Sequence, residues 1–239
     1  AFWPGPLTMV LPRRAEVADI VSAGLGTVAV RVPAHPVALA LLAACGLPVA
    51  APSANRSMLI SPTTGTHVAK SLGDAVDLIL DAGPTMVGIE STVIDLTTDP
   101  PTMLRPGMIA VPDIEAIIGP IDIATHTNAA ASRPSPGMMD RHYSPRGRLV
   151  IVAAADLPEF VRREREAGSR IGALLIETVV RNVTAVRMPA DPAGYAADLY
   201  RALHSFDDAA CSVIVVERVP SSAEWFGVRD RLERASRSA

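Results

Sequence analysis

Short β-branched segments alternate with helical segments along most of this chain, and that alternation limits the fold more than any other feature. The segment T-V-A-V-R-V at 27–32 alternates as a strand does, and the apolar stretch 34–45 after it is typical of a helix ended by Gly46. Strands joined to helices by short connections form α/β sheets. The same patterns predict further strands at 47–51, 77–81, 88–96, 102–105, 149–153, 171–176, 183–188 and 213–216, and helices at 62–72, 112–118, 157–166, 192–206 and 224–235.

A stretch low in large apolar residues separates two such α/β patterns. It runs from Gly119 to Arg148 and includes A-T-H-T-N-A-A-A-S-R-P-S-P-G, which has the composition of a linker. Its second half carries Arg141, His142 and Tyr143 in a row, and a passive spacer does not need three large recognition-type side chains. We therefore predict a first domain over 1–118, a linker over 119–147 that packs against another part of the protein, and a second domain over 148–239.

Charge and composition exclude several classes of function. A net charge of -3 lacks the basic footprint of a protein that binds nucleic acid tightly and directly. The longest apolar run, 37–45, is about half of a bilayer span, and the first residues do not form a signal pattern, so a cytoplasmic location follows by default. Cys45 and Cys211 lie in apolar surroundings and are expected to be buried thiols. The five histidines are scattered, so no protein metal site is expected.

The segment V-A-A-P-S-A-N-R-S-M-L-I-S-P-T at 49–63 changes within a few residues from apolar to polar. A strand that opens into a polar loop lies at the carboxyl edge of an α/β sheet, where ligands usually bind. A solvated turn explains the same composition, since Ser, Asn and Pro are ordinary turn formers. Ser61 followed by Pro62 also fits a plain helix cap, worth about 1 kcal/mol.

Several polar groups at predicted strand ends suit an anionic ligand. Hydroxyls and backbone N–H groups together with arginines bind phosphate or carboxylate, because a guanidinium pairs bidentately with either. Nothing in the sequence matches a Walker loop, a nucleophile elbow or a paired-histidine metal motif. Without further information, Arg31 also fits a surface ion pair and Arg105 a turn cation. The candidate residues are Thr27, Arg31, Ser53, Ser91, Thr92 and Arg105.

Seven motifs in order carry a resemblance to a known family. They are F-W-P-G-P-L-T, T-V-A-V-R-V-P-A-H-P, A-P-S-A-N-R-S, S-P-T-T, G-I-E-S-T-V-I-D-L, L-R-P-G and S-P-G-M-x-x-R-H-Y-S-P. Together they closely resemble the YrdC/Sua5 family of threonylcarbamoyl-AMP synthases, in its longer Sua5 form. The resemblance implies a YrdC-like domain with a twisted open sheet and helices, lacking its N-terminal part, joined to a small Rossmann-like Sua5 domain.

The resemblance also implies a reaction. L-threonine, bicarbonate or CO2, and ATP would give threonylcarbamoyl-AMP and pyrophosphate, the first step of t6A modification of tRNA, which makes the chain a nucleotidyltransferase. Mg2+ would accompany ATP as substrate, and a downstream threonylcarbamoyl transferase machinery would use the product. Such a reaction needs positioning and charge neutralisation more than a nucleophilic triad, so no acid or base is assigned.

Site residues follow from the resemblance motif by motif. Positioning would fall mainly to Arg31, Ser53 and Arg105. Threonine would contact Arg31, the Ala51 backbone and Ser91. ATP would contact Thr27, Ser53, Ser61, Arg105 and Tyr143, the last folding over the nucleotide from the linker. Asn55 would hold its loop in shape.

The sequence departs from the family pattern in four places, one of which is Trp225-Phe226, where the family commonly has small residues near the end. A Pro-Thr-(Asp/Glu)-Thr stretch for threonine and a Lys/Arg-rich stretch for the triphosphate come before F-W-P-G-P in the family and are absent from this sequence. We therefore expect exposed apolar surface around Phe2 and Trp3, and the activity of this chain alone stays open. Met58 replaces a usual Gly, and Met139-Asp140 replaces a basic-aromatic pair in the linker.

Two other classes of function remain as alternatives. One is a noncatalytic nucleotide- or RNA-binding module that keeps the pocket without the missing segment. The other is the carbamoyl-transfer chemistry of hydrogenase-maturation relatives of the YrdC domain, which lack the R-H-Y linker joined to this second domain.

Overall fold

A computed structural model describes residues 1–124 and 143–237 of the chain. The chain divides into two compact units, the first made of Ala1–Pro52 and Glu90–Met139 and the second of Ser53–Ile89 and Asp140–Ala239. The second unit thus includes residues 53–89, which the sequence patterns assigned to the first domain. The domain boundaries at 118 and 148 stay a prediction. No helix in the described residues is long and apolar enough to cross a membrane.

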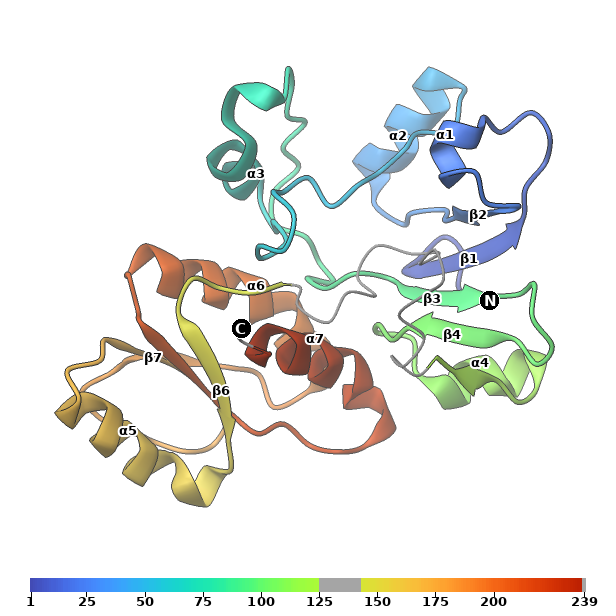
Figure 1. The fold of residues 1–239 in the computed structure, drawn as a ribbon. Coiled ribbons are helices and arrows are strands. Elements are labelled where there is room, and N and C mark those ends of the chain that lie inside the picture. The colour runs from blue at the N-terminus through green and yellow to red at the C-terminus, as the bar shows by residue number, and fades with distance from the viewer. Residues whose placement is uncertain (125–142, 238–239) are drawn as a thin grey trace. The chain divides into compact units, whose positions relative to one another are not determined.

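The first unit is built on a mixed five-stranded sheet (Figure 1). Its strand order is β2-β1-β3-β4-β5, with both parallel and antiparallel neighbours. The strands are β1 (Leu7–Pro12), β2 (Thr27–Val30), β3 (Thr92–Asp95), β4 (Thr102–Arg105) and β5 (Asp122–Ile123). The helices are α1 (Asp19–Ser22), α2 (Pro36–Cys45) and α4 (Val111–Ile118). The strand at 27–30 and the helices ending at Cys45 and Ile118 confirm the sequence patterns, whereas β1 and α1 were not predicted.

Strand pairing brings four strand ends to one edge of this sheet. β1 and β2 are antiparallel, with Met9 opposite Val30, so β2 ends where β1 begins. β1 and β3 are parallel and start together at Leu7 and Thr92. β4 runs antiparallel to β3, and its last residue, Arg105, pairs with Val93. The residues at these four ends are therefore neighbours.

The apolar surface of the first unit lies at other positions than the sequence suggests. Phe2 and Trp3 are partly exposed, and Trp3 Nε1 donates a hydrogen bond of 2.7 Å to the Leu7 carbonyl, so the exposure expected there is only partial. α2 buries none of its residues, although its sequence is almost wholly apolar. Cys45, at its end, is exposed, while Cys211 is buried and both thiols are free. The burial prediction therefore holds for Cys211 only.

The second unit contains a four-stranded, fully parallel sheet of order β6-β9-β7-β8. Its strands are β6 (Arg148–Val152), β7 (Ile171–Leu175), β8 (Thr184–Arg187) and β9 (Val213–Glu217), each within a residue or two of its predicted position. Its helices are α3 (Gly65–Leu72), α5 (Leu157–Glu166), α6 (Pro192–Asp208) and α7 (Phe226–Ser236).

Alternate residues of β7 face opposite layers, as the two-residue period of a strand requires. Ile171, Ala173 and Leu175 belong to the core cluster that includes residues of α5. Gly172 faces α6, because a Cβ there would come within 2.7 Å of the Phe206 ring. Helices thus cover both faces of the sheet.

The caps of α6 and α3 show how local sequence sets helix starts. Asp191 accepts a hydrogen bond of 2.8 Å from Gly194 N–H, so the predicted cap of α6 is confirmed. The predicted start of α3 at Pro62 is wrong. Thr64 is the cap instead, since its hydroxyl accepts from His67 N–H at 3.2 Å, and helix begins at Gly65.

Two predicted strands, 47–51 and 77–81, are irregular in the structure. Their apolar side chains include Leu47, 70% exposed, and Leu78, 73% exposed. An apolar run becomes a strand only when a neighbouring strand supplies its hydrogen bonds and a core covers one face. Neither run has that setting, so the two strand predictions were wrong.

Candidate active site

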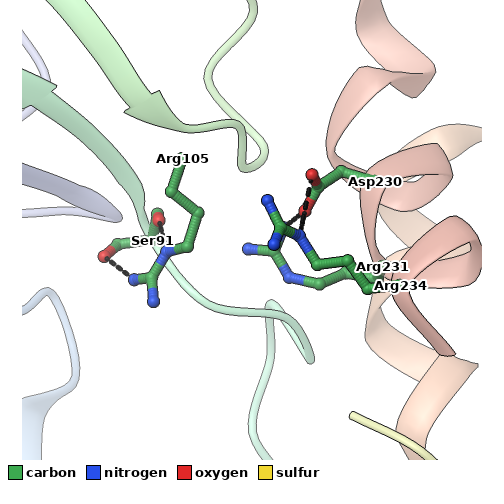
Figure 2. Close-up of polar contacts among 5 residues, drawn as sticks. All are labelled: Ser91, Arg105, Asp230, Arg231 and Arg234. Atoms are coloured by element: carbon green, nitrogen blue, oxygen red, sulfur yellow. Dashed lines mark hydrogen bonds and ion pairs between the residues drawn. The ribbon is translucent and has the colours of Figure 1, made fainter. Parts of the chain in front are cut away.

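Arg105 and Ser91 form the central contact at the shared sheet edge of the first unit. Arg105 Nε donates to the Ser91 carbonyl at 3.1 Å, and Nη2 donates to Ser91 Oγ at 3.2 Å (Figure 2). Ser91 is buried just before β3, and its Oγ also lies 2.7 Å from Thr8 Oγ1. One guanidinium therefore fixes both the backbone and the hydroxyl of Ser91.

The turn after Arg105 brings the start of β3 close to the backbone that follows β4. Thr92 Oγ1 both donates to the Ile109 carbonyl and accepts from Ile109 N–H, each at 3.2 Å. A Cβ on Gly107 would lie 2.4 Å from Thr92 N, so only glycine fits there. This packing explains the glycine at position 107, and Thr92, a candidate ligand group, is a fully buried structural residue.

Arg31 lies directly after β2, at the same edge as Arg105. Desolvation is the main cause that lowers the pKa of Arg31, and the positive charge of Arg105 lowers it further. Two arginines that repel each other at one edge favour a site for negatively charged groups.

In the second unit, the residues 53–63, here called the 53–63 loop, are held by their own polar groups. Asn55 Nδ2 donates to the carbonyls of Leu59 at 2.9 Å and Arg56 at 3.1 Å. Arg56 is fixed to α3, since its N–H donates to Ser71 Oγ at 3.1 Å. Asn55 thus crosses the loop from inside, the geometry that a loop-shaping residue requires.

Two contacts fasten the 53–63 loop to segments far along the chain. Ser144 N–H donates to the Met58 carbonyl at 3.1 Å. His204 Nε2, on α6, lies 3.1 Å from the Ser61 carbonyl. Ser61 is buried, and it does not cap α3, so its position has another cause than helix initiation.

Tyr143, the first described residue after the gap, is buried in the second unit with a left-handed backbone of φ 63°. Its ring stacks on Tyr200 with a centroid separation of 5.7 Å, and the Arg231 guanidinium lies 5.2 Å from its centroid. The end of the predicted linker therefore packs against α6 and α7. The neighbouring Arg141 and His142, and the Met139-Asp140 pair, lie outside the described residues.

The predicted site residues fall into three groups in the structure. Arg31, Ser91 and Arg105 share one edge of the first sheet. Thr27 pairs with Pro12 at the opposite end of β2, and Ala51 is exposed in the irregular segment after α2. The second unit holds Ser53, Asn55, Ser61 and Tyr143, of which Ser53 is exposed.

The parallel sheet of the second unit has a nest of backbone N–H groups that its own carboxylate fills. Glu217, buried at the end of β9, accepts from the N–H groups of Ile176 at 2.7 Å, Glu177 at 3.2 Å and Thr178 at 3.2 Å. Such concave N–H groups otherwise bind phosphate. The Glu217 carboxylate therefore already fills the anion-binding position at this end of the parallel sheet.

Two known protein families match nearly the whole length of the chain. A family model described as "Telomere recombination", of the Sua5/YciO/YrdC type, matches residues 1–107, and one described as "Threonylcarbamoyl-AMP synthase, C-terminal domain" matches residues 109–237. A protein named threonylcarbamoyl-AMP synthase from Bacillus subtilis is 39% identical over 98% of this chain and 70% of the relative. The chain belongs to the threonylcarbamoyl-AMP synthase family.

Solved structures agree with this membership in the threonylcarbamoyl-AMP synthase family. A crystal structure of Pyrococcus abyssi Sua5 complexed with L-threonine superposes with a TM-score of 0.91 and 37% identity, over 98% of this chain and 71% of that chain. A P. abyssi relative named threonylcarbamoyl-AMP synthase shows the same 37% identity. The fold prediction is therefore confirmed: a mixed, twisted sheet and a parallel sheet with helices.

Three residues with a direct part in this geometry were missed by sequence reasoning. Thr8 occurs in the F-W-P-G-P-L-T motif, but nothing local indicates that its hydroxyl reaches Ser91. His67 and His204 were dismissed as scattered histidines, although they stack on each other. Their sequence separation hides the contact, and only the S-P-T-T motif just before His67 could have directed attention there.

Replacing Met58 with glycine is expected to stabilise the protein. Met58 has a left-handed φ of 71°, which strains any residue with a Cβ, and its side chain is 41% exposed, so little burial is lost. We expect a gain of about 0.5–1 kcal/mol in the free energy of unfolding, measured by urea denaturation. The neighbouring Ser57→Gly, at a position without positive φ, should lose stability instead. Destabilisation by Met58→Gly would contradict the strain.

Proposed function

We propose that this chain provides threonylcarbamoyl-AMP synthase activity, which joins L-threonine, bicarbonate or CO2, and ATP into threonylcarbamoyl-AMP and pyrophosphate. The observation that carries the proposal is the likeness, over 98% of the chain, to a Sua5 structure complexed with L-threonine. Relatives named threonylcarbamoyl-AMP synthase favour this enzyme over a noncatalytic binding module.

The chemistry has two bond-forming steps. The threonine amine attacks CO2, loses a proton and becomes a carbamate. A carbamate oxygen then attacks the α-phosphorus of ATP, the bond to the β-phosphate oxygen breaks, and pyrophosphate leaves. The carbamate, ATP and pyrophosphate are all anionic, so the protein's contribution is to hold the anions together and offset their charge.

For threonine, we assign the carboxylate to Arg31. The guanidinium is placed directly after β2, where its planar fork can take both carboxylate oxygens. Ser91 is assigned to the same pocket because Arg105 and Thr8 hold its hydroxyl in a fixed direction. The Ala51 backbone completes the pocket in this proposal.

For ATP, we assign Arg105 to a phosphate and the 53–63 loop to the nucleotide through Ser53 and Ser61. Asn55 shapes that loop from within. Thr27 and Tyr143 are kept as nucleotide contacts. Magnesium is proposed to arrive on the triphosphate as part of the substrate, since ATP phosphates themselves supply oxygen ligands. In the described residues, no group of three or more His, Cys, Asp or Glu side chains could hold a metal ion.

The product is a mixed anhydride of a carbamate and a phosphate, so its consumer must be an acyl-type transferase. We propose that this consumer is the machinery that makes t6A in tRNA, and that the protein works in the cytoplasm. The net charge of -3 favours hand-over of the small-molecule product over tight tRNA binding by this chain.

Pyrophosphate release by the full-length protein tests the proposal. With threonine, bicarbonate and Mg2+-ATP all present, we expect pyrophosphate to accumulate, and leaving out threonine or bicarbonate should stop it. Replacing L-threonine with D-threonine is the matched control. Release that does not depend on threonine would indicate another ATP-consuming activity and would overturn the assignment.

A further inference from the structure

Two imidazoles stack at the contact between α3 and α6. The rings of His67 and His204 have centroids 3.8 Å apart and planes 27° from parallel. His67 lies in the first turn of α3, and His204 lies in the last turns of α6. The 53–63 loop leads directly into α3, so the histidine pair lies at the point where this loop is anchored.

Each imidazole makes a hydrogen bond to the loop, and the partner atom fixes its protonation. Thr63 N–H approaches His67 Nδ1 at 3.3 Å, so Nδ1 must carry a lone pair and accept. The Ser61 carbonyl, which only accepts, lies 3.1 Å from His204 Nε2, so that nitrogen must donate. His67 can accept from Thr63 N–H only when neutral, and a protonated Nδ1 could donate only to Thr63 Oγ1, which also lies 3.3 Å away. His204 can donate in either charge state.

The surroundings also favour neutral imidazoles. Burial lowers the pKa of His67, and so does the charge of His204, while Asp208 raises it and Lys70 lowers it. Burial likewise lowers the pKa of His204, against the Ser61 hydrogen bond and Asp208, which raise it. A cation at His67 would also face the positive end of the α3 dipole.

Other charged groups on the neighbouring segments are paired or lie to one side. Lys70 of α3 forms an ion pair with Asp208 of α6. Asp207 accepts from Arg146 N–H at 2.9 Å. The Asp81 carboxylate lies against Gly65 at the start of α3. The charge that most directly opposes a second proton on the stack is therefore that of the neighbouring imidazole.

We infer that the His67–His204 stack is a positioning device for the nucleotide side of the site, in which neutral His67 holds the Thr63 N–H and His204 holds the Ser61 carbonyl in their binding geometry. The inference rests on the proposed function, because that proposal assigns the 53–63 loop to ATP. The histidines act through the loop and do not touch the reacting atoms. Protonation of His67 would take away the acceptor of Thr63 N–H, leave Nδ1 a donor that only Thr63 Oγ1 could accept from, and place a cation in the stack against His204.

The direction of the pH effect follows from the lowered pKa values. At a pH above the ordinary histidine pKa of 6.5, both rings are neutral in the folded and the unfolded chain. As the pH falls through 6.5, the unfolded chain takes up protons before the folded one does, so the contact loses stability. We expect ATP affinity to fall at a pH below 6.5, where His67 of the folded protein takes up its proton, while threonine affinity changes little.

Three variants of the full-length protein test the inference. His67→Asn keeps an acceptor near the Nδ1 position but cannot titrate, so its ATP affinity should stay close to wild type at about pH 7.5 and lose the acid-dependent fall. His67→Phe keeps a stacking ring without an acceptor, so it should weaken ATP about tenfold at every pH, the effect of an unsatisfied buried N–H. His204→Gln keeps a donor for Ser61 and should bind ATP nearly as wild type does.

Two measurements separate this inference from the proposed function. Calorimetry gives ATP and threonine affinities between about pH 5.5 and 7.5, the range in which histidine titrates. Amide exchange of Thr63 without ligand reports the anchor itself, and should speed up in His67→Phe but not in His67→Asn. Equal Thr63 exchange in all variants, or an acid-dependent fall that persists in His67→Asn, would overturn the inference. Failure of the wild-type protein to bind ATP at neutral pH would overturn the nucleotide assignment. The exchange rate of the Thr63 amide would still show whether His67 holds the loop.

Discussion

Replacing Arg31 with alanine is expected to remove most of the affinity for L-threonine and to leave ATP affinity unchanged. A charged hydrogen-bonding pair contributes about 1.5–3 kcal/mol, which corresponds to a loss of roughly 10- to 150-fold. Arg105→Ala should lower the affinity for ATP by a similar factor. The affinity for threonine should also fall in Arg105→Ala, by a smaller factor, because Arg105 holds Ser91 through both the carbonyl and the hydroxyl.

The asymmetry between the two arginine variants is the informative result, and isothermal titration calorimetry on the full-length protein measures it. Arg14→Ala removes the same charge from an exposed position of the first unit and serves as the control. Arg31→Lys should fall between wild type and alanine, because an ammonium cannot make the bidentate contact. Unchanged affinities for both ligands in Arg31→Ala and Arg105→Ala would contradict the site assignment.

Replacing Asp230 with alanine is expected to have the largest effect on stability. Asp230 Oδ2 accepts from Arg231 Nη1 at 2.6 Å and from Arg234 Nε at 2.9 Å (Figure 2). Both arginines are only 1% exposed and Asp230 is 8% exposed, so this carboxylate offsets two buried positive charges on α7. Removing one partner of a buried ion pair costs about 3–5 kcal/mol.

Urea denaturation of Asp230→Ala and of Glu233→Ala separates this effect from a general loss of negative charge. Glu233 is on the same helix and exposed, so its removal should change the free energy of unfolding by less than about 0.5 kcal/mol. Asp230→Asn keeps the shape but not the charge and should resemble the alanine variant. If the free energy of unfolding of Asp230→Ala lies within about 1 kcal/mol of the wild-type value, the buried cluster does not stabilise α7 as described.

Sequence patterns predicted the parallel sheet of the second unit well because β7 and β9 are fully buried and α6 is capped locally by Asp191. The apolar stripe of α6 is at most 1% exposed; its residues are Tyr195, Leu199, Leu203 and Phe206. β7 and β9 are apolar runs covered on both faces, which is the setting in which such runs form strands. Local sequence and tertiary packing agree there.

The first unit was harder to predict because apolar composition does not specify which neighbours will cover it. The segment 47–51, like 77–81 of the second unit, carries strand-like residues but pairs with no strand, while β1 follows Pro6, ends at Pro12 and was not predicted. The edge that gathers Arg31, Ser91 and Arg105 depends on the pairing of β1 with β3, in which Leu7 lies opposite Thr92, 85 residues further along the chain. Motif resemblance identified these residues, and pairing explains why they are neighbours.

The 53–63 loop shows the same division between local and distant information. Its polar composition indicated a ligand loop, and the role of Asn55 in shaping it was inferred from the motif. The anchors provided by Ser144 and His204 lie more than eighty residues away in sequence and follow only from the fold. A loop held by several distant segments can present a fixed backbone to a nucleotide, which catalysis by positioning requires.

The most direct test of the central claim is the mass of the product formed from carbon-13 bicarbonate, L-threonine and Mg2+-ATP by the full-length protein. We expect threonylcarbamoyl-AMP that is heavier by one mass unit than the product made from unlabelled bicarbonate, with pyrophosphate formed in equal amount. A product of unchanged mass, such as threonyl-AMP, or pyrophosphate formed without any labelled adenylate, would contradict the account.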